Sequence, residues 1–103
     1  MLSRLMQIRK NRWSKVYESS EEELVALLQA RGITAQRWEA AEFEQLAVRT
    51  VDVTTDIYLA EGSASFRAGG QNYSMQPGDM LQLPANTTLA ITAGLSGCVC
   101  YET

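Results

Sequence analysis

The sequence predicts an all-β domain, a small barrel or a sandwich, with one helix in its N-terminal third. Turn signals recur about every ten residues in the second half of the chain, and short apolar segments lie between them. A capping pattern followed by leucines at helical spacing predicts the helix. With 103 residues, 46% hydrophobic content and only two prolines, the chain can form one domain with a core, and disorder is not expected.

A single helix is expected from about Glu21 to Arg31. Ser20-Glu21-Glu22-Glu23 is a capping-box pattern whose acidic first turn suits the positive end of the helix dipole, and Gly32 stands where the helix would stop. Three leucines follow the cap at helical spacing: Leu24, Leu27 and Leu28. We expect this stripe to pack against the β-domain, and Trp38 beyond it to fill part of the core.

A β-hairpin is predicted from Ser65–Ala68 to Gln71–Met75. Gly69-Gly70 separates the two segments and supplies the positive φ angles that a two-residue turn requires. If the residues that flank these glycines pair, Phe66 faces Tyr73, so one face of the hairpin is apolar and the other is polar.

The remaining elements follow from turn signals and alternation. Gln76–Asp79 has Pro and Gly at the central positions of a type II turn. Strands are predicted at Met80–Leu83, at Thr87–Thr92 and at Cys98–Tyr101, with a loop over Ala93–Gly97 between the last two.

The apolar alternation changes phase at Gly62. Ile57 and Leu59 are odd-numbered, whereas Ala64 and Phe66 are even-numbered. A glycine at such a change predicts a bulge or a sharp bend, which the closure of a small barrel commonly uses.

The segment from Gly78 to Ala93 resembles the second motif of the cupin family, which runs Gly, five residues, Pro, one residue, Gly, two residues, His, three residues, Asn. Pro84 fits the pattern, and Asn86 stands at the second glycine, where Asn tolerates positive φ. Leu89 stands at the metal-binding histidine and Ala93 at the asparagine.

The segment that ends at Gly62 is similar to the strand that closes the family's first motif. Counting back from Gly62 places the family's glutamate ligand on Thr55 and its paired histidines on Arg49 and Val51. A register shifted by one residue uses other positions: Val48, Thr50 and Asp56. The chain contains no histidine, and neither register supplies the imidazole and thiolate ligands that transition metals favour.

The resemblance implies a cupin-like β-barrel, also described as a double-stranded β-helix or jelly roll, without a metal or another cofactor. Residues 38–103 would form this barrel. Residues 1–37 would form a basic arm and a helix packed on it, so that the whole chain is one structural domain.

The first functional hypothesis is a metal-free, non-catalytic barrel that binds a small ligand, for which an anion is one option. The candidate ligand-binding residues are Arg49, Val51, Thr55, Ile57, Leu89 and Ile91. Arg49 could be the polar anchor, because a guanidinium binds a carboxylate or a phosphate through two hydrogen bonds. Alternatively, Arg49 points outward or pairs with Asp52.

Two other hypotheses stay open. One is a structural module for dimerisation or protein docking, in which Val51 and Leu89 fill the former site. The other is a metal-independent isomerase or epimerase, which needs an acid and a base. The side chains available for that chemistry are Tyr58, Tyr73, Tyr101, Asp56, Glu61 and the thiols of Cys98 and Cys100. No spacing pairs two of them, so no catalytic residue is assigned.

Charge is unevenly distributed along the chain. Five of the nine basic residues lie within the first 17 positions, and all twelve acidic residues lie after them. This basic segment could contact nucleic acid, but only Trp13 and Tyr17 interleave with it and the net charge of the chain is −3. An edge strand, or a contact with the acidic body of the protein, is the preferred interpretation.

The sequence also suggests a compartment, a role for the two cysteines and an oligomeric state. No apolar run approaches the ~20 residues of a membrane span and no secretory signal is recognised, so we expect a cytoplasmic protein. Cys98 and Cys100 would point to the same side of a strand and are interpreted as core residues. A homodimer is expected, because the edge strands of so small a sheet need covering.

Overall fold

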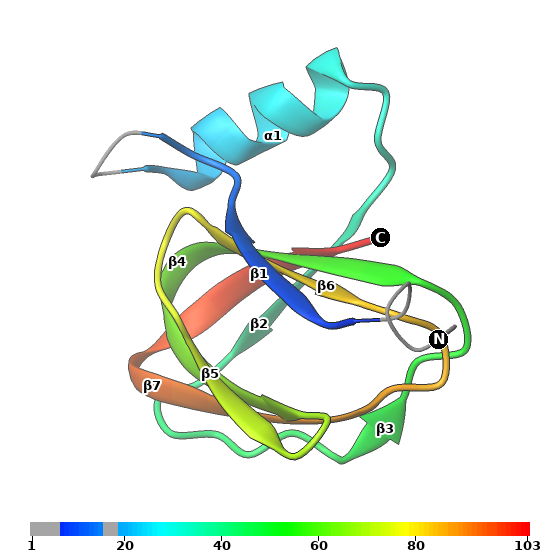
Figure 1. Ribbon diagram of the computed structural model, residues 1–103. Coiled ribbons are helices and arrows are strands. Elements are labelled where there is room, and N and C mark those ends of the chain that lie inside the picture. Colours follow the sequence, from blue (N-terminus) through cyan, green and yellow to red (C-terminus); the bar gives the residue numbers. More distant parts are fainter. Residues whose placement is uncertain (1–6, 16–18) are drawn as a thin grey trace.

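The computed structural model describes residues 7–15 and 19–103, which form one helix and seven strands in a single antiparallel sheet folded over on itself (Figure 1). The elements are β1 (Arg9–Arg12), α1 (Glu21–Ala30), β2 (Gln36–Ala40), β3 (Arg49–Thr50), β4 (Thr55–Ala68), β5 (Gln71–Met75), β6 (Asp79–Leu83) and β7 (Thr88–Glu102). The all-β fold with one N-terminal helix is therefore confirmed.

Two long strands, β4 and β7, run through both layers of the fold. The first half of β4 pairs with β6 and with the last part of β7, and its second half pairs with β5 and with the first part of β7. One layer has the order β1-β6-β4-β7-β2, and the other has the order β5-β4-β7-β3. The two layers enclose the core between them.

Both long strands bend where Gly62 of β4 lies against Gly97 of β7. The β4–β7 register shifts on either side of Gly62, which confirms the bulge expected from the change of phase. Gly62 has φ +79°, and a Cβ there would collide with the Gly97 carbonyl. The predicted loop over Ala93–Gly97 is wrong, because these residues belong to β7, in which residues 94–97 form the bulge between the Ala64–Ala93 and Gly62–Cys98 pairs.

The hairpin and the turn after it were predicted correctly. Phe66 pairs with Tyr73 as expected, and both turn glycines have positive φ, +58° at Gly69 and +79° at Gly70. In the next turn the Asp79 amide donates to the Gln76 carbonyl at 2.9 Å. These local signals set the register of β4, β5 and β6.

The helix begins and ends where the capping residues predict. The Ser20 hydroxyl accepts a hydrogen bond from the Glu23 amide at 3.2 Å, and Gly32 has φ +66° just beyond the last turn. Leu24 and Leu28 are buried against the outer face of the longer layer, where α1 lies in Figure 1. No helix among the described residues is both long and apolar enough to cross a membrane.

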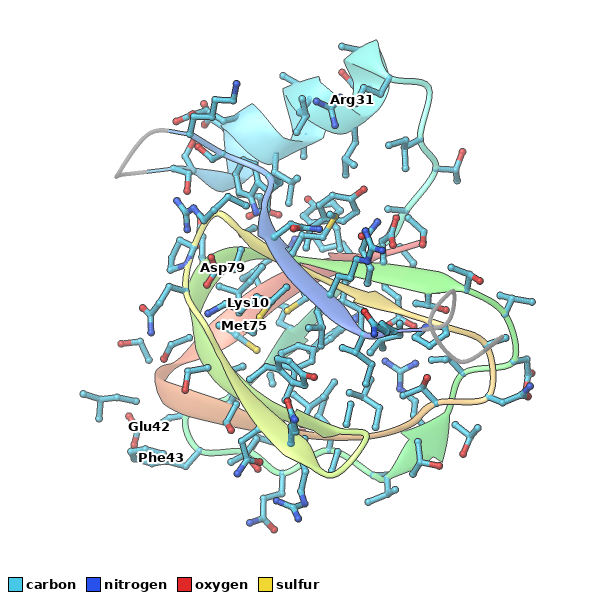
Figure 2. The ribbon with its side chains drawn as sticks, in the orientation of Figure 1. Lys10, Arg31, Glu42, Phe43, Met75 and Asp79 are labelled. Carbon is cyan, nitrogen blue, oxygen red and sulfur yellow. The ribbon has the colours of Figure 1, made fainter. Side chains whose placement is uncertain are left out.

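The described part of the basic segment forms the edge strand β1, which pairs with β6. Arg12 Nη1 lies 2.9 Å from Asp79 Oδ1, and Lys10 Nζ lies 3.7 Å from Asp79 Oδ2. Figure 2 shows Lys10 and Asp79 side by side. This part of the segment thus contacts the protein's own acidic body, while Arg4 and Tyr17 lie outside the described residues.

The core lies between the two layers and is mainly aliphatic. Its buried residues include Val51, Ile57, Leu59, Phe66, Met75, Leu81, Leu83, Leu89, Ile91, Cys98 and Cys100. A second, smaller cluster lies under α1 on the outer face, around Tyr58 and Ala60. Residue 38, where the barrel was expected to begin, lies inside β2, and β1 supplies one edge of the longer layer.

Candidate functional site

Four of the six candidate ligand-binding residues are core residues. Val51, Ile57, Leu89 and Ile91 all lie in the interior cluster, and none is more than 5% exposed. Thr55 is buried as well, and its hydroxyl donates to the Val53 carbonyl at 2.8 Å. These five side chains fill the centre of the barrel and leave Arg49 as the one candidate that reaches solvent.

The positions that the cupin resemblance assigns to a metal are brought together but do not fit one. Arg49 pairs directly with Leu89, and the Val51 amide donates to the Thr87 carbonyl at 2.9 Å. The side chains of Val51 and Leu89 carry no lone pair, and the Arg49 guanidinium is a cation without an acceptor. Over residues 7–15 and 19–103, no three His, Cys, Asp or Glu side chains are placed to hold a metal ion.

Arg49 binds Glu102 rather than Asp52, so the Asp52 alternative was wrong. Its Nη1 lies 2.7 Å from Glu102 Oε2, and its Nη2 lies 2.6 Å from Oε1. Residues directly opposite each other in an antiparallel pair share a face, so Arg49 lies on the inner face with Leu89. Glu102 lies two residues beyond buried Cys100 and shares that inner face.

Trp38 completes this arrangement. Its indole Nε1 donates to Glu102 Oε1 at 3.0 Å, and its ring packs against the interior cluster from the β2 side. Trp38 is partly buried, so it closes the end of the core rather than filling its centre. We call Trp38, Arg49 and Glu102 the mouth cluster, because they lie where the inner face opens to solvent.

The mouth cluster borders an open hollow of about 740 Å³. Leu46 adds apolar surface beside Trp38, and Thr34 and Gln36 add polar groups. The Arg49 side chain is 41% exposed and that of Glu102 is 18% exposed, so the ion pair can be reached from solvent. This size lies within the usual range for small-molecule sites.

The Arg49 charge in the hollow is paired with a carboxylate. The hydrogen bonds that Arg49 donates to Glu102 raise the pKa of Arg49 above its ordinary value, so the guanidinium stays charged and is paired. Glu39 also lines the hollow, and its carboxylate lies 3.0 Å from Arg37 Nη2. Within residues 7–15 and 19–103, Arg49 is the single basic side chain that lines this hollow.

The side chains considered for acid-base chemistry lie elsewhere. Tyr58 and Tyr101 belong to the outer face under α1, and burial raises the pKa of both phenols. The Tyr101 hydroxyl donates to Glu21 Oε2 at 2.6 Å. Neither these two tyrosines nor the other candidates, Tyr73, Asp56 and Glu61, line the mouth hollow.

The two cysteines are buried on the inner face, as their spacing predicts. The Cys100 thiol donates to Cys98, which raises the pKa of Cys100, and its burial raises that pKa further. Cys100 therefore stays protonated, and neither thiol lines the mouth hollow. Both act as core residues.

Glu102, Gln36 and Leu46 were not expected as site residues. A signal for Glu102 was present, since strand alternation carried one step past Cys98 and Cys100 places it on the same inner face. This alternation gives the face of Glu102 but does not identify it as the partner of Arg49. Leu46 had no comparable signal, because it lies in a connection between strands. Its backbone amide donates a hydrogen bond to the Ile91 carbonyl of β7.

No family model matches the chain, and no curated protein matches it in sequence. Several solved structures are similar. A protein of unknown function from Rhizobium leguminosarum is 22% identical, with a TM-score of 0.61 over 67% of this chain and 65% of its own length. The chain thus spans slightly less than two thirds of that protein.

Two further structures match over most of this chain. A DUF861 family protein from Thermotoga maritima is 16% identical, with a TM-score of 0.64 over 94% of this chain and 98% of its own. A cupin superfamily protein from Desulfitobacterium hafniense is 17% identical, with a TM-score of 0.60 over 93% of this chain and 74% of its own. At these identities the likeness is one of fold.

Proposed function

From the premise that this chain has the cupin fold, we propose that it binds a small molecule at the mouth of its barrel, without a metal and without catalysing a reaction. The observation that carries the proposal is the open hollow of about 740 Å³ bordered by Trp38, Arg49 and Glu102. It combines an apolar wall with a few converging polar groups, which is typical of ligand sites.

The filled interior supports a site at the mouth rather than at the barrel centre. Val51 and Leu89 take the space that the family uses for a metal and its ligands. A bound molecule would therefore lie at the mouth cluster, outside these two side chains. Arg49 is the residue that links the two levels, because it pairs with Leu89 through the backbone and lines the hollow with its side chain.

A binding function fits the mouth better than catalysis does. General acid-base chemistry needs a group that can take or give a proton near the working pH. The Arg49 guanidinium stays charged, and Glu102 accepts hydrogen bonds from both Arg49 and Trp38. An isomerase or epimerase would need a proton-transfer pair that the residues lining this hollow do not offer.

Thermal unfolding in the presence of small carboxylates, sugars and phosphates tests the proposal. A ligand that binds only the folded state raises the free energy of unfolding, by about 2.7 kcal/mol at a concentration of 100 Kd. We expect at least one compound to raise the midpoint in the wild type and to lose most of that effect in Arg49→Ala.

Arg67→Ala is the matched control for this experiment, because Arg67 is also exposed but lies away from the mouth hollow. It should respond to the compound as the wild type does. An equal response in Arg49→Ala, or no response to any compound in the wild type, would overturn the proposal.

We propose dimerisation between copies of this chain as a second candidate function. Phe43 and Leu95 are 58% and 69% exposed, and the Phe43 amide donates to the carbonyl of Gly94, the residue before Leu95. Figure 2 shows Phe43 at the outer edge of the molecule. Phe43 also has φ +57°, a strained backbone state for a bulky residue that a functional role would explain.

Sedimentation analysis of the wild type and of a Phe43→Ser, Leu95→Ser double variant tests this second candidate. A wild-type dimer that becomes a monomer in the variant would support it, because the two apolar side chains would then hold the interface. A monomeric wild type, or a variant that still dimerises with the wild-type affinity, would rule out this surface.

A further inference from the structure

We infer that the mouth cluster selects a neutral, hydroxyl-bearing ligand, of the polyol or sugar class, over an anion. The inference rests on the proposed function and names its ligand class. It differs from the sequence-based expectation in the role of Arg49. The sequence suggested Arg49 as an anchor for a carboxylate or a phosphate, whereas Glu102 already binds it in the structure.

The charge of the site disfavours an anion. Arg49 is the single cation among the described residues that line the hollow, and Glu102 already holds it through two hydrogen bonds. An anion bound to the remaining Arg49 donors would lie beside the Glu102 carboxylate, and it could form a bidentate pair with the guanidinium only by displacing Glu102. Like charges at such a distance oppose binding.

The Arg49–Glu102 ion pair also keeps unused hydrogen-bonding positions. A guanidinium has five N–H donors, and Arg49 uses two of them on Glu102. A carboxylate has about four acceptor positions, and Glu102 receives three donors, two from Arg49 and one from Trp38. The bonded Arg49–Glu102 pair thus keeps unused donors and an unused acceptor position, and a hydroxyl, which both donates and accepts, can bind both groups.

The apolar wall of the hollow suits the face of a sugar ring. The Trp38 ring is held against the interior cluster on one side, its indole N–H is fixed on Glu102, and Leu46 lies on the same hollow. A ring with an apolar body and an engaged polar tip offers its face to C–H groups. A polyhydroxylated ring presents C–H groups on its faces and hydroxyls at its edge, which matches this combination.

The same account predicts what happens when the Glu102 charge is removed. Glu102→Gln has nearly the same shape and keeps one oxygen acceptor, but it leaves the Arg49 charge unneutralised. The hollow should then favour an anion, because the guanidinium is free to take a carboxylate in a bidentate pair. Glu39→Gln is the matched control, since it removes one acidic charge from the same hollow without touching Arg49.

Calorimetric titration with glucose and glucuronate tests the inference, since the two differ by one CH₂OH group replaced by a carboxylate. In the wild type and in Glu39→Gln we expect glucose to bind at least tenfold more tightly than glucuronate. In Glu102→Gln we expect the order to reverse. The wild-type comparison decides the ligand class even if Glu102→Gln does not fold.

The outcomes separate the two proposals. Tighter binding of glucuronate by the wild type, or binding of neither compound, would overturn the neutral ligand class. The proposed function would still stand if any compound of the thermal panel depended on Arg49, and it would fall with the ligand class if none did.

Discussion

Gly62 and Gly97 allow the two long paired strands β4 and β7 to come into close backbone contact where both bend. Gly62 has φ +79°, and its missing side chain leaves room for the Gly97 carbonyl. Gly97 has φ +72°, and a Cβ there would meet the Ala40 carbonyl of β2. The bend turns the last part of β7 so that Glu102 reaches the mouth.

Gly62→Ala should destabilise the protein by several kcal/mol. A non-glycine residue at positive φ costs about 1–2 kcal/mol, and the clash with the Gly97 carbonyl adds an overpacking cost of about 1–3 kcal/mol. Gly70→Ala is the matched control, because Gly70 has the same φ of +79° but open space around its Cα. Urea unfolding measures both, and equal losses would contradict a steric role for Gly62.

The Glu21 carboxylate should make stability depend on pH. Hydrogen bonds from Arg37 and Tyr101 lower the pKa of Glu21 below its ordinary value of 4.5. A lowered folded-state pKa adds stability above the unfolded-state pKa, and this stability is lost as pH falls through the folded-state value. Glu21→Gln should therefore be less stable than the wild type at pH 7, with the difference vanishing in acid.

Glu22→Gln is the control for this pH dependence, because Glu22 lies in the same first helical turn and has no salt bridge among the described residues. Unfolding curves at pH 7 and at pH 3 compare the three proteins. A Glu21→Gln deficit that persisted unchanged at pH 3, or that Glu22→Gln shared, would contradict the assignment.

At the residue scale, the sequence indicated which side chains are apolar better than it indicated which side chains bind each other. Val51 and Leu89 were named as candidate ligand-binding residues, with a filled former site as the alternative hypothesis, and both are core residues. The partner of Arg49 was missed because Glu102 lies 53 positions away and faces inward only if the last part of β7 is continuous. An ion pair between distant strands depends on topology, which local patterns do not fix.

At the scale of elements, the helix α1 binds the barrel through one narrow stripe. Leu24 and Leu28 are buried against Tyr58 and Ala60, whereas Leu27, on the same stripe by sequence, is only partly buried. Helical spacing identified the stripe, but the sequence could not rank its members, because the ranking depends on where the sheet lies beneath the helix.

Leu24→Ala should cost about 2–5 kcal/mol of stability, since it removes a fully buried side chain and leaves a cavity. Leu27→Ala, the same substitution on the same helix, should cost clearly less, because part of that side chain is already in water. Chemical denaturation of both variants provides the comparison. Similar losses at the two positions would contradict the packing described for α1.

The register of the strands joined by a tight turn was predicted correctly. The continuity of a strand through a bend was not predicted. The hairpin at Gly69-Gly70 places β4 against β5 as expected, because a two-residue turn fixes the pairing. The glycines at 94 and 97 were interpreted as a loop, although they bend a single strand. A bulge and a turn use the same residue type, so pairing with a distant strand decides between them.

At the scale of the whole molecule, the fold keeps the cupin arrangement while its centre is apolar. The purified protein should therefore contain no stoichiometric Fe, Mn, Ni or Zn, and chelation should leave its unfolding temperature unchanged. Elemental analysis before and after chelation checks this expectation. One transition-metal ion per chain, with a loss of stability on its removal, would contradict the account of the filled centre.

The most direct test of the mouth site uses the two tryptophans as internal probes. Trp38 Nε1 bonds Glu102 in the mouth cluster, whereas Trp13 Nε1 bonds the Leu59 carbonyl and its ring lies in the cluster under α1. The two indole N–H signals in an NMR titration with glucose and glucuronate report on these separate places. We predict that glucose shifts the Trp38 signal saturably and leaves the Trp13 signal in place. Indole signals that move alike, or a Trp38 signal that responds to neither compound, would contradict binding at the mouth.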